Sequence, residues 1–198
     1  MHFIMEHEQI SYYEALKYLA RKYHIEFQER ELSAEEMAIR NDRESMFLVN
    51  EFAQKHFSST LHNHIDGKSI GLGYFRERGF RDDIIQKFQL GYSLDQRDAF
   101  TQSAIKAGYN KEYLVKTGLT LESDNGYLAD RFRGRVMFPV HSLSGKVVAF
   151  GGRILKKDDK MAKYVNSPES EIYHKSSELY GIYFAKQAIV RQERCFLV

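Results

Sequence analysis

Apolar residues recur every three or four positions between residues 34 and 61, and this spacing predicts one long helix. Ser33 and Glu36 stand at its start with the separation of a capping box, in which the two side chains satisfy each other's backbone amides. The sequence Ile-Asp-Gly at 65–67 is expected to end the helix, because glycine interrupts helical periodicity.

Shorter helices are predicted on both sides of this long one. Within the first 27 residues, Ser11 and Glu14 form another capping box before apolar residues at helical spacing. Glycines mark the ends of later helices, since glycine readily takes the left-handed backbone found just past a helix end. The later helices are expected to run toward Phe75 with Gly79 behind it, over 82–88, over two stretches within 98–118 that end at Gly108 and Gly118, and over 179–191.

Alternation of apolar residues changes the prediction to a β-hairpin over residues 134–155. Val136, Phe138 and Val140 would share one face of its first strand. The glycine pair at 151–152 falls inside the second strand, where glycine weakens pairing. We therefore expect a β-bulge there, or a close approach of the backbone to a ligand.

Two shorter strands complete the pattern, at 90–92 and at the apolar end 195–198. Cys195 in the latter is expected to be a small core residue. Tyr183 and Phe184 are likewise expected in the core. The order of elements predicts an α+β fold, with a helical amino-terminal half followed by a small antiparallel sheet with flanking helices.

Basic residues are concentrated between 131 and 163, a segment that contains nine Lys and Arg but only two acidic residues. This segment has a net charge of +7, which leaves −5 for the rest of a chain whose total is +2. Arg131, Arg133 and Arg135 alternate as they enter the predicted strand, so all three would project from one face and repel unless an anion neutralises them. The pattern indicates an anion-binding face. A solvated charged loop is the alternative, and for Arg135 alone a salt bridge.

Length and composition limit the class of protein. A chain of 198 residues with 43% hydrophobic and 28% charged residues suits one globular domain, with or without a small appendage. No apolar stretch approaches the roughly 20 residues that span a bilayer, and the first residues lack a signal-peptide pattern. The single cysteine excludes an internal disulfide and a cysteine-built zinc site. A cytoplasmic location is therefore expected.

Four segments in the carboxyl-terminal third carry a family resemblance: RFRGRVMFPV, VVAFGGR, KYVNSPES and HKSSELYGIYFA. Their order resembles the RNA polymerase core of bacterial DnaG-type primases, which lay RNA primers on single-stranded DNA. The resemblance implies that residues 1–30 are the tail of a zinc-binding domain with its linker helix. It implies that 31–194 form the amino-terminal subdomain of the core and that 195–198 begin a Toprim domain. The chain would then be a fragment of a longer protein, and Met1 would not be its natural start.

The resemblance also implies a nucleic-acid-binding surface without catalytic residues. The acids that hold divalent metals in such enzymes would lie in the Toprim domain, outside this chain. Arginine binds phosphates and stacks on bases, a tyrosine ring stacks, and an asparagine amide bonds a sugar or base edge. The residues assigned to this surface are Arg78, Arg131, Arg133, Arg153, Lys163, Tyr164, Asn166 and Lys175.

Cofactors and partners follow from the same resemblance. No cofactor is expected in this chain, whereas the full-length protein would use Mg²⁺ or Mn²⁺ and a structural Zn²⁺. The expected partners are single-stranded DNA template, RNA primer and ribonucleoside triphosphates, together with the replicative helicase and single-strand-binding protein, and no membrane. The expected location is the bacterial nucleoid, within the cytoplasm.

Other interpretations of the same residues are less favoured. The adjacent acids at 82–83 and 158–159 are interpreted as solvated charges, and so are His56, His62 and His64, although a metal role is the alternative for each set. A non-enzymatic single-strand-binding module is the main alternative function, with the basic and aromatic residues as its whole activity. A phage or plasmid primase-helicase, a Toprim nuclease and a structural clamp subunit are further alternatives.

Overall fold

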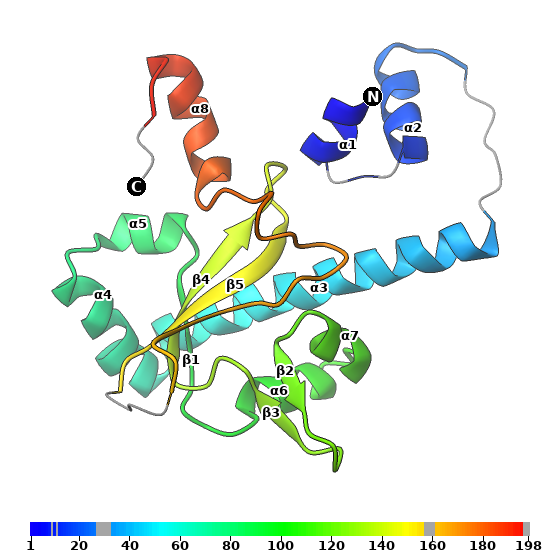
Figure 1. The fold of residues 1–198 in the computed structure, drawn as a ribbon. Helices are drawn as coiled ribbons and strands as arrows, with labels where there is room; N and C mark the ends of the chain where they lie inside the picture. Colours follow the sequence, from blue (N-terminus) through cyan, green and yellow to red (C-terminus); the bar gives the residue numbers. More distant parts are fainter. Residues whose placement is uncertain (9, 11, 27–32, 157–160, 196–198) are drawn as a thin grey trace.

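The computed structural model describes residues 1–8, 10, 12–26, 33–156 and 161–195. Helices surround a small sheet, and the longest helix passes across it (Figure 1). The elements in chain order are α1 (His2–Glu8), α2 (Tyr12–Lys22), α3 (Ala34–Asn63), the π-helical segment η1 (Gly67–Leu72), α4 (Gly73–Glu77), α5 (Asp82–Lys87), β1 (Gly91–Ser93), α6 (Ala99–Lys106), α7 (Lys111–Lys116), β2 (Thr120–Glu122), β3 (Leu128–Asp130), β4 (Arg135–His141), β5 (Val147–Ile154), β6 (Tyr164–Asn166) and α8 (Ile182–Gln192).

The long helix α3 forms as its sequence predicts. The Glu36 amide donates to Ser33 Oγ at 3.1 Å and the Ser33 amide donates to the Glu36 carboxylate at 2.9 Å, so the capping box is confirmed. Buried residues begin at Met46 and recur every three or four positions to Leu61. The first turns are largely exposed and extend beyond the sheet (Figure 1). The capping box predicted at Ser11 involves a residue outside the described ones.

The strands β1, β4, β5 and β6 form one antiparallel sheet in that order, with β6 at an edge. Neighbouring residues of β4 face opposite sides. Met137 therefore packs with Phe150 and residues of α3, α6 and α7, whereas Val136 packs with residues of η1, α4 and α5. The predicted hairpin and the α+β class are confirmed.

The glycine pair in β5 does not form the predicted bulge. Gly151 and Gly152 pair in regular register with β4, and the register shift lies instead between Val140 and His141. A Cβ atom on Gly152 would lie 2.7 Å from Cδ1 of Phe132, so the missing side chain makes room for protein atoms. The bulge prediction was wrong because close packing within the protein also requires glycine inside a strand.

Glycine ends both α6 and α7, as predicted. Gly108 and Gly118 follow these helices with φ of 90° and 67°, a backbone that side chains with a Cβ rarely adopt. A Cβ on Gly118 would also lie 2.2 Å from Cδ of Pro168, so the segment after β6 packs closely against the end of α7. The hairpin of β2 and β3 and the edge strand β6 were not predicted. Each of these strands has three residues, too few to show an alternating pattern.

The ends of the chain give a different outcome. Cys195 is exposed, so the prediction that it is a core residue was wrong. Residues 196–198 and the expected domain boundary at 30–31 lie outside the described residues, and both boundaries stay predictions. Within the described part of the chain, no helix combines the length and apolar character needed to cross a membrane.

Candidate nucleic-acid interface

The edge strand β6 presents polar side chains outward. Tyr164 and Asn166 lie on one face of the strand, while Val165 points the other way and packs against the core. In the ladder, Tyr164 pairs with Arg153 and Asn166 pairs with Gly151. Tyr164 is 63% exposed, so the strand offers an accessible aromatic ring beside a cation.

Cations and aromatic rings alternate across this edge. The guanidinium carbon of Arg153 lies 4.7 Å from the centre of the Tyr74 ring and 5.8 Å from that of Tyr164. Arg78 lies 5.7 Å from the Tyr74 ring, and Nζ of Lys163 lies 5.8 Å from the Tyr164 ring. Each exposed contact of this kind contributes about 0.5–1 kcal/mol. We call these five residues the ridge; they come from α4, β5 and β6 and from residues flanking α4 and β6.

Tyr74 is the ridge residue that sequence reasoning missed. It lies in α4, almost 80 residues before Arg153, and packs partly against the apolar cluster that contains the fully buried Phe75. Its ring is therefore held from below by the core while Arg153 and Arg78 lie over it. A lone tyrosine in a short helix gives no sequence signal for such a contact.

Arg131 extends the ridge along β6. Its Nε donates to the carbonyl of Asn166 at 3.3 Å. The preceding residue is fixed firmly: the Asp130 carboxylate accepts from the amides of Phe100 and Thr101 at 2.8 and 2.9 Å, at the start of α6. Burial raises the pKa of Asp130, and the hydrogen bonds act against this rise. Arg131 therefore projects from an anchored backbone beside β6.

Arg133 is exposed but does not carry its charge alone. Its Nε lies 3.4 Å from the Asp95 carboxylate, which also forms an ion pair with Lys156. One carboxylate thus lies between two basic side chains. A phosphate approaching Arg133 would have to compete with Asp95, so its contribution to anion binding is reduced.

Arg135 does not share a face with the other two arginines, so the prediction of three aligned guanidiniums was wrong. The strand β4 begins at Arg135, and residues 131–134 form a turn in which Gly134 has a φ of 68°. Arg135 is only 2% exposed. Its guanidinium donates to backbone carbonyls, among them that of Ala162 at 2.9 Å, rather than to an acid among the described residues. The salt-bridge alternative was therefore wrong as well.

Lys175 lies in the segment between β6 and α8. Its amide donates to the Glu169 carboxylate at 3.0 Å, and the same carboxylate accepts from His174 Nδ1 at 3.1 Å. Within the described part of the chain, no hydrogen bond, ion pair or ring contact joins Lys175 to the ridge. Its assignment to nucleic-acid binding stays a prediction.

The predicted solvated state of the three histidines is wrong for His56. Its ring lies 5.4 Å from that of Phe100, edge to face, and Nδ1 is 3.4 Å from the Ser103 hydroxyl. Burial lowers the pKa of this imidazole. His64, by contrast, is partly exposed and lies 3.8 Å from Asp66.

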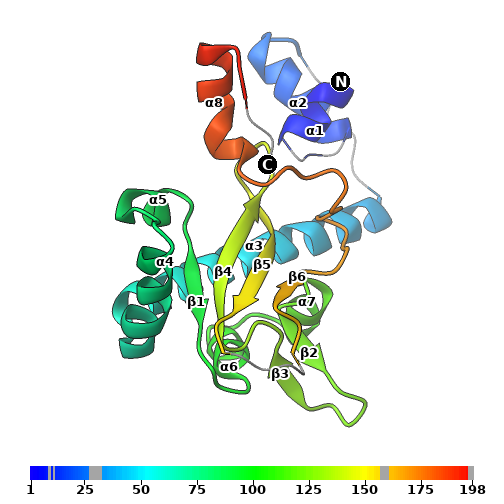
Figure 2. The ribbon, with the colours of Figure 1, turned by 60° about the vertical axis from the view of Figure 1, so that its left-hand side comes forward.

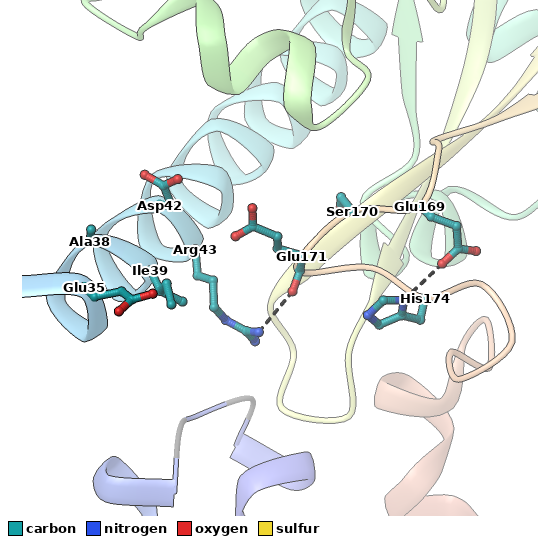
Figure 3. A pocket seen from close by; sticks show the side chains of 9 residues that line it. All are labelled: Glu35, Ala38, Ile39, Asp42, Arg43, Glu169, Ser170, Glu171 and His174. Carbon is teal, nitrogen blue, oxygen red and sulfur yellow. Dashed lines mark hydrogen bonds and ion pairs between the residues drawn. The ribbon is translucent and has the colours of Figure 1, made fainter.

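A second surface lies between α3 and the loop after β6 (Figure 3). The groove has a volume of about 760 Å³ and is lined by Glu35, Ala38, Ile39, Asp42, Arg43, Glu169, Ser170, Glu171 and His174. Arg43 reaches across it and donates to the Glu171 carbonyl at 3.0 Å. Four of the lining residues are acidic, against Arg43 and His174, so the groove is more acidic than the ridge and less suited to phosphates.

The described residues do not form a metal centre. Among them, no three His, Cys, Asp or Glu side chains are grouped so that they could hold a metal ion. Asp82 and Asp83 are exposed and pair with Arg76 at 3.1 Å and with Arg81 at 2.6 Å, in keeping with their interpretation as surface charges. These residues do not fit the divalent ions that nucleotidyl transfer uses, and no catalytic step is assigned to them.

Solved structures with this arrangement are catalytic cores of primases. A structure described as the DnaG primase catalytic domain bound to ssDNA has a TM-score of 0.67 at 32% identity, over 75% of this chain and 47% of that one. The RNA polymerase domain of Mycobacterium tuberculosis primase DnaG has a TM-score of 0.69 at 33% identity, over 76% and 48%. The zinc-binding and RNA polymerase domains of Aquifex aeolicus primase give 0.69 at 27%, over 96% and 44%.

The sequence comparisons agree. The chain belongs to the family described as DNA primase catalytic core, N-terminal domain, whose sequence profile matches residues 56–186. The DNA primase of Pasteurella multocida is 34% identical over 199 residues, and that of Halalkalibacterium halodurans is 37% identical over 196. The chain covers 33% and 32% of their lengths, so it spans about a third of these relatives.

Proposed function

We propose that this chain is the template-binding part of a DNA primase, an enzyme that synthesises short RNA primers on single-stranded DNA. The observation that carries the proposal is the ridge, where the exposed ring of Tyr164 and the partly buried ring of Tyr74 alternate with Arg78, Arg153 and Lys163. Family membership supports it, and so does the likeness to a catalytic domain described as bound to ssDNA.

The ridge has the two features that single strands require. Aromatic faces stack with any base, and cations beside them contact the backbone phosphates. Because Arg153 is already held between two rings, it loses little conformational freedom when a strand binds. Stacking of this kind tolerates any sequence, so we expect the ridge to guide a template rather than to read its bases.

In this proposal the chemistry takes place elsewhere in the whole protein. Mg²⁺ or Mn²⁺ would be held by acidic residues of a Toprim domain, and Zn²⁺ by a separate domain. The replicative helicase and single-strand-binding protein would be partners of the whole protein at the nucleoid. This chain alone should not polymerise. If this chain incorporated labelled ribonucleotides in a template-dependent reaction with Mg²⁺ or Mn²⁺, the catalytic acids would lie within it, and this part of the proposal would be wrong.

Amide chemical-shift mapping tests the location of the interface. A ¹⁵N-labelled chain is titrated with an unstructured oligothymidylate, and the backbone amides of residues 163–166 and of Arg153 should shift most. The amides of 169–174, beside the acidic groove, serve as an internal control and should shift least. Perturbation confined to that groove, or absent along β6, would overturn the proposal.

A further inference from the structure

The buried guanidinium of Arg135 requires an explanation, because a charged side chain is rarely taken out of water without compensation. Arg135 is 2% exposed, and burial lowers its pKa, although a guanidinium stays protonated in proteins. Among the described residues it meets backbone carbonyl groups only. The side chain therefore holds backbone segments together through hydrogen bonds to their carbonyls and is not part of an ion pair among the described residues.

The carbonyls that Arg135 binds lie at the entrance of β6. Its Nη2 donates to the Ala162 carbonyl at 2.9 Å, and its Nη1 donates to that of Lys163 at 3.3 Å and, more weakly, to that of Gly152 at 3.5 Å. The Lys163 carbonyl also accepts from the Ile154 amide at 3.0 Å. One planar fork thus joins the end of β5 to the two residues that lead into β6.

This fastening matters because β6 is short. Only three residues of β6 pair with β5, so few ladder hydrogen bonds hold this edge. The outer half of the ridge consists of Lys163, whose own carbonyl Arg135 binds, and Tyr164, which follows it directly. Hydrogen bonds donated by a cation are stronger than neutral ones, so Arg135 adds a large share of the local constraint.

The surrounding core is shaped to accept the side chain. A Cβ on Gly152 would lie 3.1 Å from Cδ of Arg135 and 2.7 Å from Cδ1 of Phe132. The glycine therefore leaves space for the aliphatic stem of Arg135 beside the buried Phe132 ring. Because a larger residue at 152 would occupy the space of the Arg135 stem, the glycine indicates that the buried position of Arg135 is a specific feature of the fold.

We infer that Arg135 is a positioning residue for single-strand binding. It does not touch the strand; it fixes the backbone at Ala162 and Lys163 so that the Lys163 ammonium and the Tyr164 ring meet the phosphates and bases at defined positions. The inference rests on the proposed function, and it differs from the expectation that Arg135 contributes its charge to an anion-binding face. In this role the number and direction of the guanidinium N–H donors matter, and the charge of Arg135 does not contact the strand.

Arg135→Lys separates these two roles, because lysine keeps the charge but lacks the planar fork that reaches two carbonyls. We expect this variant to stay folded at 25 °C, to bind a single-stranded oligothymidylate roughly 5- to 10-fold more weakly, and to exchange the amide protons of Val165 and Ser167, which face β5, faster before DNA is added. Arg43→Lys is the matched control, since Arg43 also donates to a carbonyl but lies in the acidic groove. It should leave affinity unchanged.

A double-mutant cycle with Lys163→Ala supplies a readout that a purely structural role would not move. Lys163→Ala should flatten the salt dependence of binding by about 0.7 in the original chain. It should flatten it by much less in the Arg135→Lys chain, where Lys163 is already displaced. Arg135→Met, which keeps the stem, repeats the test if the lysine variant does not fold.

Additive effects of the two changes would overturn the inference, and so would a loss of thermal stability with affinity unaltered. Failure of the proposed function gives a different result: the unaltered chain would then not bind the oligonucleotide at all. Amide exchange at β6 would still report whether Arg135 fastens the strand.

Discussion

The β4–β5 hairpin carries an aromatic stack at each of its ends. At the open end lies the ridge, where Tyr164 is 63% exposed beside Arg153 and Lys163. At the turn end, below α8 in Figure 2, the ring of His141 stacks on Tyr183 at 5.9 Å and meets the edge of Phe184 at 4.9 Å. His141 is only 4% exposed.

Burial gives the two stacks different roles. His141 Nε2 lies 2.8 Å from the side-chain oxygen of Gln89, and burial lowers the pKa of the imidazole to about 4, so at neutral pH it is an uncharged packing group. At the ridge, by contrast, Arg153 and Lys163 lie beside the exposed ring of Tyr164. Ring contacts alone therefore do not mark a binding surface. The ridge is the candidate interface because it combines an exposed ring with basic side chains.

Acid should produce the largest effect, and mainly at the turn end. Unfolding returns His141 to an ordinary pKa near 6.5, so the unfolded chain binds a proton between pH 6.5 and about 4 that the folded chain does not. The contribution of His141 to the free energy of unfolding is therefore fully present above pH 6.5. It is lost as the pH falls through this range, by up to about 3 kcal/mol. Urea unfolding at a series of pH values measures the fall.

His141→Phe is the control for this prediction, because it keeps a ring against Tyr183 but cannot titrate. The variant should be less stable at pH 7 and show a weaker pH dependence between 4 and 6.5. His56, whose pKa burial also lowers, contributes with the same sign in both chains and cancels in the comparison. Identical pH slopes in the two chains would show that His141 is not held neutral.

Removing the exposed ring should have the next largest effect, on binding. Tyr164→Ala should weaken affinity for single-stranded DNA by roughly 5- to 150-fold, the range expected for loss of one stacked base. Tyr164→Phe keeps the stacking face and should retain most of the affinity. Tyr183→Ala, which removes the partly exposed ring stacked on the buried His141, should lower thermal stability and leave affinity unchanged. Fluorescence anisotropy with labelled oligothymidylate measures the affinity of all three variants. Equal losses of affinity in Tyr164→Ala and Tyr183→Ala would contradict the distinction between the two stacks.

A smaller gain is expected from Asp95→Asn. This carboxylate pairs with Arg133 and Lys156, so its removal frees two basic side chains for phosphate. Affinity should rise by about two- to five-fold, the modest size typical of exposed ion pairs. The measurement is made at low salt, where surface charges are least screened. A decrease would mean that Asp95 orients Arg133 productively.

The acidic groove should show no effect at all. Glu171→Gln and Glu35→Gln change its charge at positions that line the groove. Affinity for the oligonucleotide should stay within experimental error in both variants. A clear increase would indicate that the strand passes this groove and that the interface is wider than the ridge.

The long elements of the fold could be predicted from the sequence because they carry local signals. α3 combines a capping box with a sustained apolar period, and Gly108 and Gly118 mark helix ends through their backbone conformation. The strands β2, β3 and β6 have three residues each, and their existence depends on partners brought together by the whole fold. No local pattern specifies them.

The interface was predictable only in part, for a similar reason. Arg153, Lys163 and Tyr164 lie in one short stretch whose motifs resemble a known family, and the structure brings them together. Arg135 was placed on the wrong face because the alternation was counted from a residue that precedes the strand. Tyr74 joins the ridge through packing of distant segments, which a single sequence does not display.

The salt dependence of binding tests the central claim most directly. With three to five phosphate contacts from Arg78, Arg131, Arg133, Arg153 and Lys163, each contributing about 0.7, the plot of log affinity against log salt should have a slope of roughly −2 to −3.5. Changing Arg153 and Lys163 together to Ala should flatten it by about two contacts, or roughly 1.4. A slope near zero, or one that these changes leave intact, would contradict the assignment of the ridge as the single-strand interface.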